Sequence, residues 1–129
     1  MIRSLFEILL LSFTIFAESS GEPYEGKVAV GSVIRNRVET YQESYIDVIL
    51  AHRQFSCYDN KKKLMKHIKR IEAEASLECL VVAVGIYYNI ISDNTDGALY
   101  YVRMDIIRSW MKKMRVTILY GRHKFMIEG

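Results

Sequence analysis

Residues 18–26 read ESSGEPYEG and separate two apolar segments of the chain. Gly21 is typical of a helix C-terminus, where glycine often ends the helix. Pro23 is typical of the first position of a helix, because its missing N–H would have no partner there. The stretch therefore predicts the end of one helix and the start of the next, and this break decides the fold of the N-terminal part of the chain.

The first apolar segment, residues 4–19, predicts a helix with apolar residues around nearly its whole circumference, which is typical of a buried helix. It also resembles the start of a signal peptide, because residues 5–17 follow Arg3. Glu7 interrupts the run, however, and the segment is shorter than the roughly 20 residues of a membrane-spanning helix. We therefore expect no stable membrane span. We also expect the segment to remain on the mature protein as the helix that carries Glu18.

The rest of the chain reads as further helices followed by a β element. Gly26 and Gly31 weaken the helix propensity of the second segment, which predicts close approach of a neighbouring backbone. The expected fold class is α+β, mostly α, in one domain of residues 1–129 with a small C-terminal β-hairpin. The expected helices are residues 24–38, 45–51 (capped by Ser44), 66–89 and 104–113, and the expected strands are residues 116–119 and 124–127 across the turn 120–123.

The length of 129 residues suits one domain, and the formal net charge is +3. Much of the positive charge lies in residues 61–70. This cluster is either a solvated helix face or a surface that attracts an anionic polymer, such as teichoic acid, phospholipid headgroups or nucleic acid. Its members are Lys61, Lys62, Lys63, Lys66, Lys69 and Arg70.

Residue types that hold metals or cofactors are sparse and scattered. Cys57 and Cys79 match no zinc-binding spacing, and they are either two free thiols or one disulfide. The three histidines lie far apart in the sequence, and no nucleotide-binding glycine loop or nucleophile elbow appears. The sequence therefore predicts no metal and no cofactor, and acids remain as the candidates for chemistry.

Three acids lie close together at the predicted helix break. Glu22 and Glu25 fall at the start of the second helix, where negative charge complements the helix dipole, so a structural role suffices for both. Glu18 falls in the last turn of the first helix, where the dipole and burial beside Ile15 and Phe16 both favour a raised pKa. A carboxylic acid that stays protonated near neutral pH is what a glycoside-cleaving general acid must be. The alternative is an ordinary exposed glutamate at a frayed helix end.

Four stretches of the chain, in order, carry a shared pattern. They are ESSGEPYEG at residues 18–26 with NRV at 36–38, QFSC at 54–57, TDGALYY at 95–101 and GRHKF at 121–125. These resemble the SleB-type cell wall hydrolases, which include spore cortex-lytic enzymes and similar phage lysins. The corresponding family patterns are E-A-R-G-E-P-x-E-G with N-R-V, Q-F-S, T-x-G-A-x-x-Y and G-x-H-x-F. The resemblance covers nearly the whole chain.

The resemblance implies a lysozyme-like fold of the lytic transglycosylase type, with Glu18 as the catalytic acid. It also implies a glycan groove bordered by further motif positions, although each of these side chains has a purely structural alternative such as packing. Two departures touch the electrostatics of the site: residues 19–20 are Ser-Ser where the family has Ala-Arg, and residues 99–100 are Leu-Tyr where many members have Thr-His. The expected substrate-binding residues are Gln54, Phe55, Ser56, Tyr101 and His123.

The resemblance implies a peptidoglycan-degrading enzyme that cleaves between N-acetylmuramic acid and N-acetylglucosamine. A lytic transglycosylase needs one acid, whereas a hydrolytic muramidase needs a second carboxylate, for which Asp59, Asp93 and Asp96 are the candidates. A third alternative is a non-enzymatic basic protein that binds the wall or nucleic acid, although we expect no nucleic-acid partner. We expect action at the bacterial cell wall, in the periplasm or envelope. A phage-encoded protein made in the host cytoplasm is equally compatible with the residues.

Overall fold

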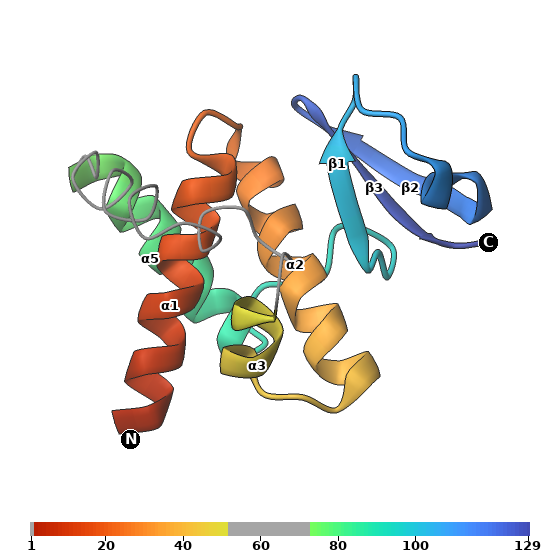
Figure 1. Ribbon diagram of the computed structural model, residues 1–129. Coiled ribbons are helices and arrows are strands. Elements are labelled where there is room, and N and C mark those ends of the chain that lie inside the picture. The colour runs from red at the N-terminus through yellow and green to blue at the C-terminus, as the bar shows by residue number, and fades with distance from the viewer. Residues whose placement is uncertain (1, 52–72) are drawn as a thin grey trace.

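The computed structural model of the protein describes residues 2–51 and 73–129. Helices form one side of the molecule and a small sheet forms the other, with α2 between α1 and the sheet (Figure 1). The helices are α1 (Ile2–Ser19), α2 (Tyr24–Tyr41), α3 (Tyr45–Leu50), α5 (Ala73–Tyr87) and the 3-10 helix η2 (Ser109–Lys113), and the strands are β1 (Tyr100–Arg103), β2 (Met114–Tyr120) and β3 (His123–Glu128). The expected fold class, mostly α with a small C-terminal β element, is confirmed.

The predicted break between α1 and α2 is confirmed, with α1 ending at Ser19 and Pro23 as the N-cap of α2. The backbone N–H of Glu22 donates to Ser19 O at 3.0 Å, which closes the turn. Gly21 does not have a left-handed backbone conformation, because positive φ among the described glycines occurs at Gly97 and Gly121. The turn is therefore closed by this hydrogen bond rather than by a left-handed glycine.

Gly31 lies where α2 meets the two neighbouring helices. A Cβ there would come within 2.9 Å of Ile86 Cγ1 in α5 and 3.3 Å of Ile15 Cδ1 in α1. The predicted close approach at Gly31 is therefore present, but side chains of α5 and α1 make it rather than a neighbouring backbone. Gly26 has a local neighbour instead, because its Cβ would meet the Cβ of Glu22 at 3.0 Å.

Two helix ends are held by side chains, and the sequence predicted only the first of them. Ser44 caps α3, since its Oγ accepts a hydrogen bond from the backbone N–H of Asp47 at 3.0 Å. The C-terminal end of α5 is held by the buried Arg35 of α2, whose Nη1 donates to Ile86 O at 3.2 Å and to Ile91 O at 2.7 Å. Residues 66–72, the start of the predicted long helix, lie outside the described residues.

The core lies where α1, α2 and α5 meet, and α2 also packs against α3 and the sheet. The expectation that α1 is buried all round is wrong for the described structure, because only the face toward the other helices is covered. The side chains of Leu5, Phe6, Leu9 and Phe13, elsewhere on α1, are exposed.

In the part of the chain that the structure describes, no helix is long and apolar enough to cross a membrane. Fully buried core residues include Leu11, Ile15, Val30, Ile34, Val82 and Ile86.

The sheet is antiparallel with the strand order β1-β3-β2. The predicted hairpin is confirmed as β2 and β3, and β1 adds a third strand that the sequence did not predict, with Tyr101 opposite Phe125. The predicted helix at residues 104–113 is wrong for its first half. The backbone N–H of Met104 donates to Arg122 O at 2.9 Å, which extends strand-like pairing past β1, and only the 3-10 helix η2 follows.

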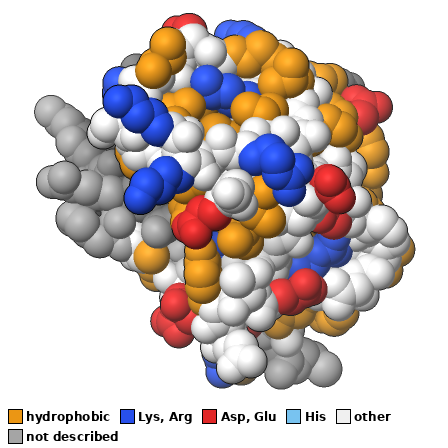
Figure 2. Space-filling model, turned by 90° about the vertical axis from the view of Figure 1, so that its right-hand side faces the viewer, with side chains coloured by type: hydrophobic (Ala, Val, Ile, Leu, Met, Phe, Trp, Pro, Cys, Tyr) orange, Lys and Arg blue, Asp and Glu red, His pale blue; other side chains and the backbone are white. Residues whose placement is uncertain are grey.

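Figure 2 shows the side of the molecule that carries the sheet. Hydrophobic patches lie there between basic and acidic side chains. Exposed hydrophobic residues of the sheet, of η2 and of the segment between β1 and η2 include Ile107, Trp110, Val116 and Leu119. The ring of Trp110 lies 5.9 Å from that of Tyr100, so η2 packs over the start of β1.

Candidate active site

A pocket of about 310 Å³ lies where the end of α1 faces the sheet. Residues 17–22 line one side of it, and Arg103 of β1, Arg122 of the β2–β3 turn and His123 of β3 line the other. These segments are far apart in sequence, and the antiparallel pairing of β1 with β3 places Arg103 opposite His123. The pocket therefore depends on the sheet being docked against the α1–α2 turn.

Glu18 lines this pocket from the last turn of α1, and its side chain is part-buried. Its neighbour Ser19 is buried, and Ser19 Oγ donates back to Ile15 O at 2.6 Å, so Ser19 supports the helix end. The position expected for the acid, at the C-terminus of an apolar helix beside a pocket, is therefore present. Its role as the catalytic acid stays a prediction.

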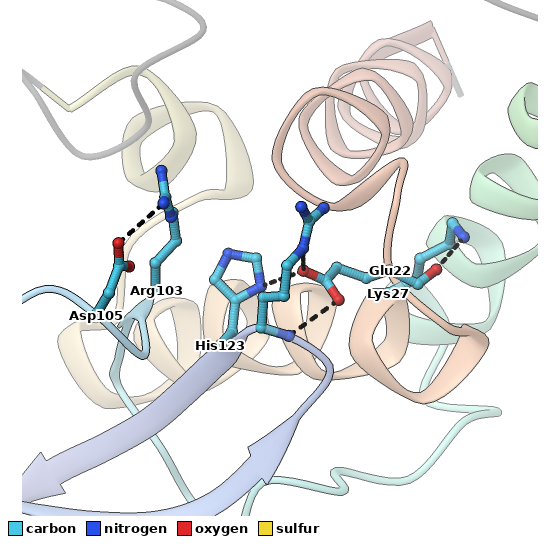
Figure 3. Close-up of polar contacts among 6 residues, drawn as sticks. Glu22, Lys27, Arg103, Asp105 and His123 are labelled. Atoms are coloured by element: carbon cyan, nitrogen blue, oxygen red, sulfur yellow. Dashed lines mark hydrogen bonds and ion pairs between the residues drawn. The ribbon is translucent and has the colours of Figure 1, made fainter.

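Glu22 lies deeper in the same pocket, and it is the centre of a polar network (Figure 3). Its side chain is only 4% exposed. Oε1 lies 3.2 Å from His123 Nδ1 and accepts from Arg122 Nε at 3.4 Å, and Oε2 accepts from the backbone N–H of Arg122 at 3.2 Å. The carbonyl of Glu22 accepts from the buried Lys27 Nζ at 2.7 Å. Glu22 thus joins the α1–α2 turn to the β2–β3 turn.

The β2–β3 turn approaches Glu22 so closely that any side chain at residue 121 would displace the Glu22 carboxylate. Gly121 has φ +53°, a left-handed conformation that side chains disfavour. A Cβ at this position would also overlap Glu22 Oε2. The hairpin glycine therefore serves two needs at once: the turn itself and the contact with Glu22.

His123 is buried at the start of β3 beside this carboxylate. Burial lowers the pKa of His123, Glu22 opposes this by raising it, and Arg122 and Arg103 lower it further. The net direction is downward, so the imidazole is neutral at neutral pH despite its carboxylate neighbour. Nδ1 lies 3.2 Å from a carboxylate oxygen, which can only accept, so this contact favours a proton on Nδ1.

The other expected site residues divide into two groups. The ring of Tyr101 lies 5.5 Å from that of His123 and 5.8 Å from that of the buried Phe125, so it packs behind the pocket. Tyr101 is not among the residues that line the pocket. Gln54, Phe55 and Ser56 lie outside the described residues, as do Cys57 and the basic cluster at residues 61–70. Cys79 is a free, buried thiol whose pKa burial raises to about 11.

The two departures from the family pattern fall in different places. Ser20, where the family has Arg, lines the pocket and is exposed, while Arg103 and Arg122 supply positive charge on the opposite wall. Tyr100 lies at the far end of β1, where the guanidinium of Arg37 stands 5.4 Å from its ring centre. The first departure therefore touches the pocket, and the second does not.

Two spare acids that the sequence suggested do not reach the pocket. Asp93 Oδ1 accepts from the backbone and hydroxyl of Thr95, its Oδ2 accepts from Gly97 N, and these hydrogen bonds lower the pKa of Asp93 against the effect of burial. Asp96 is exposed in the same loop, and Asp59 lies outside the described residues. Among residues 2–51 and 73–129, the carboxylates that line the pocket are Glu18 and Glu22.

Sequence reasoning missed Glu22, Arg103 and Arg122 as pocket residues. The helix dipole gave Glu22 a sufficient structural explanation, and no local pattern shows which residues a turn 100 positions later brings to it. The motif positions of Glu22 and of Gly121 were the available signal, since a sheet docked on the α1–α2 turn brings them together. Among the described residues, no group of three or more His, Cys, Asp or Glu side chains could hold a metal ion.

Comparisons with known proteins agree on one family. The family model described as Cell Wall Hydrolase matches residues 21–126. The spore cortex-lytic enzyme of Bacillus subtilis is 29% identical over 122 residues, and that of Bacillus cereus is 30% identical over the same length. These matches cover 92% of this chain but only 37% and 43% of the relatives, so the chain spans about two fifths of their length.

Two solved structures are similar over most of their length. The catalytic domain of the germination-specific lytic transglycosylase SleB from Bacillus anthracis has a TM-score of 0.73 at 27% identity, covering 94% of this chain and 93% of that one. The catalytic domain of the Bacillus cereus SleB protein has a TM-score of 0.69 at 28% identity, covering 94% and 89%. The fold expected from the sequence is therefore that of these catalytic domains.

Proposed function

The chain belongs to the Cell Wall Hydrolase family, and from this premise we propose that it degrades bacterial peptidoglycan by cleaving the glycan strand. The observation that carries the proposal is the pocket that holds Glu18 at the end of α1, opposite two arginines and a histidine. Residues 1–129 would form the catalytic domain, and the site of action would be the bacterial cell wall. The similarity to the catalytic domain of a lytic transglycosylase supports the choice of reaction.

In the first step, Glu18 gives its proton to the glycosidic oxygen between N-acetylmuramic acid and N-acetylglucosamine. The bond between C1 of the muramic acid and this oxygen breaks, and the leaving sugar departs with a free hydroxyl. The positive charge that develops at C1 is stabilised by the acetamido group of the substrate itself. A protonated carboxylic acid at the scissile bond is what this step requires.

In the second step, the C6 hydroxyl of the same muramic acid attacks C1 and gives its proton to the Glu18 carboxylate. A 1,6-anhydro ring forms, and the acid is restored for the next cycle. The attacking hydroxyl belongs to the same sugar, so the step is intramolecular. Such proximity can be worth about 7 to 11 kcal/mol of a barrier.

Hydrolysis by a second carboxylate is the less favoured reaction. A muramidase needs a free carboxylate to activate water or to attack the sugar. Glu22 is the other carboxylate that the described residues bring to the pocket, but its oxygens already accept from Arg122 and face His123 Nδ1. Asp93 is committed to its own loop. The described acids therefore favour the single-acid reaction.

A peptidoglycan zymogram separates this enzyme from a basic binding protein. We expect the purified chain to clear a band in a gel that contains bacterial cell walls. A matched preparation in which Glu18 is replaced by glutamine should refold in the same gel and leave the walls intact. Binding to the walls by both preparations without any clearing by the native chain would refute the enzymatic function and support the binding protein.

A further inference from the structure

The Glu22 carboxylate contacts His123 in addition to the contacts with Arg122 that already connect the α1–α2 turn to the β2–β3 turn. The backbone N–H and the guanidinium of Arg122 already hold the Glu22 carboxylate to the β2–β3 turn. His123 adds a titratable ring to this contact and also lines the pocket of Glu18. In Figure 3 its second ring nitrogen points away from Glu22, toward the side on which Arg103 lies.

We propose that Glu22 holds His123 in the Nδ1–H tautomer, so that Nε2 faces the pocket as a hydrogen-bond acceptor for a hydroxyl or amide N–H of the bound aminosugar. Glu22 is then a positioning residue, and His123 is the residue that touches the substrate. The inference rests on the proposed function, because it takes the occupant of the pocket to be the glycan strand. It differs from the expected role of His123 as a border residue by assigning the acceptor atom and the residue that fixes it.

The geometry supports a fixed ring rather than a loosely placed one. Tyr101 contacts the imidazole edge to face at 5.5 Å, and Phe125 lies 6.4 Å away on the same strand. Only a neutral imidazole carries an unprotonated nitrogen, and a proton on Nδ1, which lies 3.2 Å from the Glu22 carboxylate, leaves Nε2 as that nitrogen. Two aromatic neighbours and one carboxylate thus restrict both the orientation and the tautomer.

The charges around the ring keep it neutral where the enzyme would work. Burial and the two arginines lower the pKa of His123 from its ordinary value of 6.5, and Glu22 only partly opposes them. As the pH falls through this lowered pKa, Nε2 gains a proton and becomes a donor, so the acceptor is lost on the acid side. In the part of the chain that the structure describes, the titratable or charged groups that face the ring or share its pocket are Glu18 of α1, Glu22 of the α1–α2 turn, Tyr101 and Arg103 of β1, and Arg122 of the β2–β3 turn.

The tautomer is measurable on the native chain without any activity. In a ¹⁵N-labelled sample, the two-bond proton–nitrogen spectrum of His123, assigned by its loss in His123→Gln, should show Nδ1 protonated and Nε2 unprotonated at pH 7 and above. The opposite tautomer, an even mixture, or an imidazolium at pH 7 would overturn the proposal. The tautomer itself is read on the folded native protein, and the His123→Gln variant serves only to assign the signal.

The acceptor role is measurable with a bound glycan. A tetrasaccharide of alternating N-acetylglucosamine and N-acetylmuramic acid should bind the Glu18→Gln protein without being cleaved. At saturation the Nε2 resonance should move in the direction of hydrogen-bond acceptance while Nδ1 stays protonated. An Nε2 resonance that does not move, while other pocket resonances do, would overturn the proposal, and so would a failure of the tetrasaccharide to bind.

The pH dependence separates an acceptor from a merely structural histidine. In the Glu18→Gln background, affinity for the tetrasaccharide should fall by up to about tenfold, the worth of one hydrogen bond, as His123 takes up its proton. A second change, His123→Gln, provides an amide that does not titrate and should remove this dependence, whereas Glu39→Gln, an exposed carboxylate on α2, should leave it intact. An unchanged acid limb in the His123→Gln protein would overturn the inference. If the native chain clears the zymogram but the acid limb is unchanged in the His123→Gln protein, the inference is wrong and the proposed function stands. If the native chain does not clear the zymogram, the proposed function is wrong.

Discussion

Glu18→Gln should abolish peptidoglycan lysis while the protein stays folded. Glutamine has nearly the same shape but no proton to give at the glycosidic oxygen, and a positioned general acid contributes about 10²- to 10⁴-fold to the rate. We expect the rate of wall clearing to fall by at least about a hundredfold. The melting temperature should hold or rise, since functional sites often carry residues that are unfavourable for stability. Turbidity loss of a wall suspension and a thermal melt measure the two effects.

The matched control for this change is Glu39→Gln. Glu39 is an exposed carboxylate on α2, away from the residues that line the pocket. The substitution makes the same chemical change, carboxyl to amide, at an exposed position, so it shows whether such a change by itself lowers lysis. We expect it to retain native lysis. Substantial lysis by a well-folded Glu18→Gln protein would remove Glu18 from the catalytic role.

Gly121→Ala should destabilise the protein and disable the pocket together. A left-handed alanine costs about 1 to 2 kcal/mol by itself. The new Cβ would also overlap Glu22 Oε2, so the carboxylate must leave its contacts with Arg122 and His123. A hydrogen bond to a charged group is worth about 1.5 to 3 kcal/mol, which adds to the loss. Denaturant unfolding measures the free energy change, and wall clearing measures the activity.

Gly97→Ala is the control that isolates the contact with Glu22. Gly97 also has a positive φ, at +82°, but a Cβ there would meet only Ile127 Cδ1 at 4.0 Å. It therefore carries a backbone cost without a clash, and it lies outside the pocket. We expect Gly121→Ala to lose about 1.5 to 3 kcal/mol more than Gly97→Ala and to lose activity that Gly97→Ala keeps. Equal losses at the two positions would show that the Glu22 contact contributes little.

Short sequence patterns predicted the helix ends and the β-turn, because the residues that determine these features are neighbours in the sequence. Pro23 marked the start of α2, Ser44 capped α3, and the turn at residues 120–123 joined two strands. The burial of α1 was overestimated because its composition is apolar on every face, and composition does not tell which face finds partners. Strand β1 was missed because its four residues become a strand only through pairing with β3.

The candidate site was predicted at one end and missed at the other. Glu18 was identified because a helix end, an apolar segment and a family motif all pointed to it. Glu22 looked satisfied by the helix dipole, and its contacts come from Arg122 and His123, a hundred residues later. Only the three-dimensional structure, in which the sheet packs on the α1–α2 turn, shows that Glu22 is buried and accepts hydrogen bonds from Arg122.

The most direct test of the central claim is the mass of the product. Peptidoglycan digested by the native chain should release muropeptides that end in 1,6-anhydro-N-acetylmuramic acid, which are lighter by one water than hydrolysis products. The Glu18→Gln protein, run in parallel, should release neither kind. Mass spectrometry separates the two. Mainly anhydro ends would establish the single-acid reaction at Glu18, whereas mainly reducing-end muramic acid would contradict it and identify the enzyme as a muramidase with a second acid.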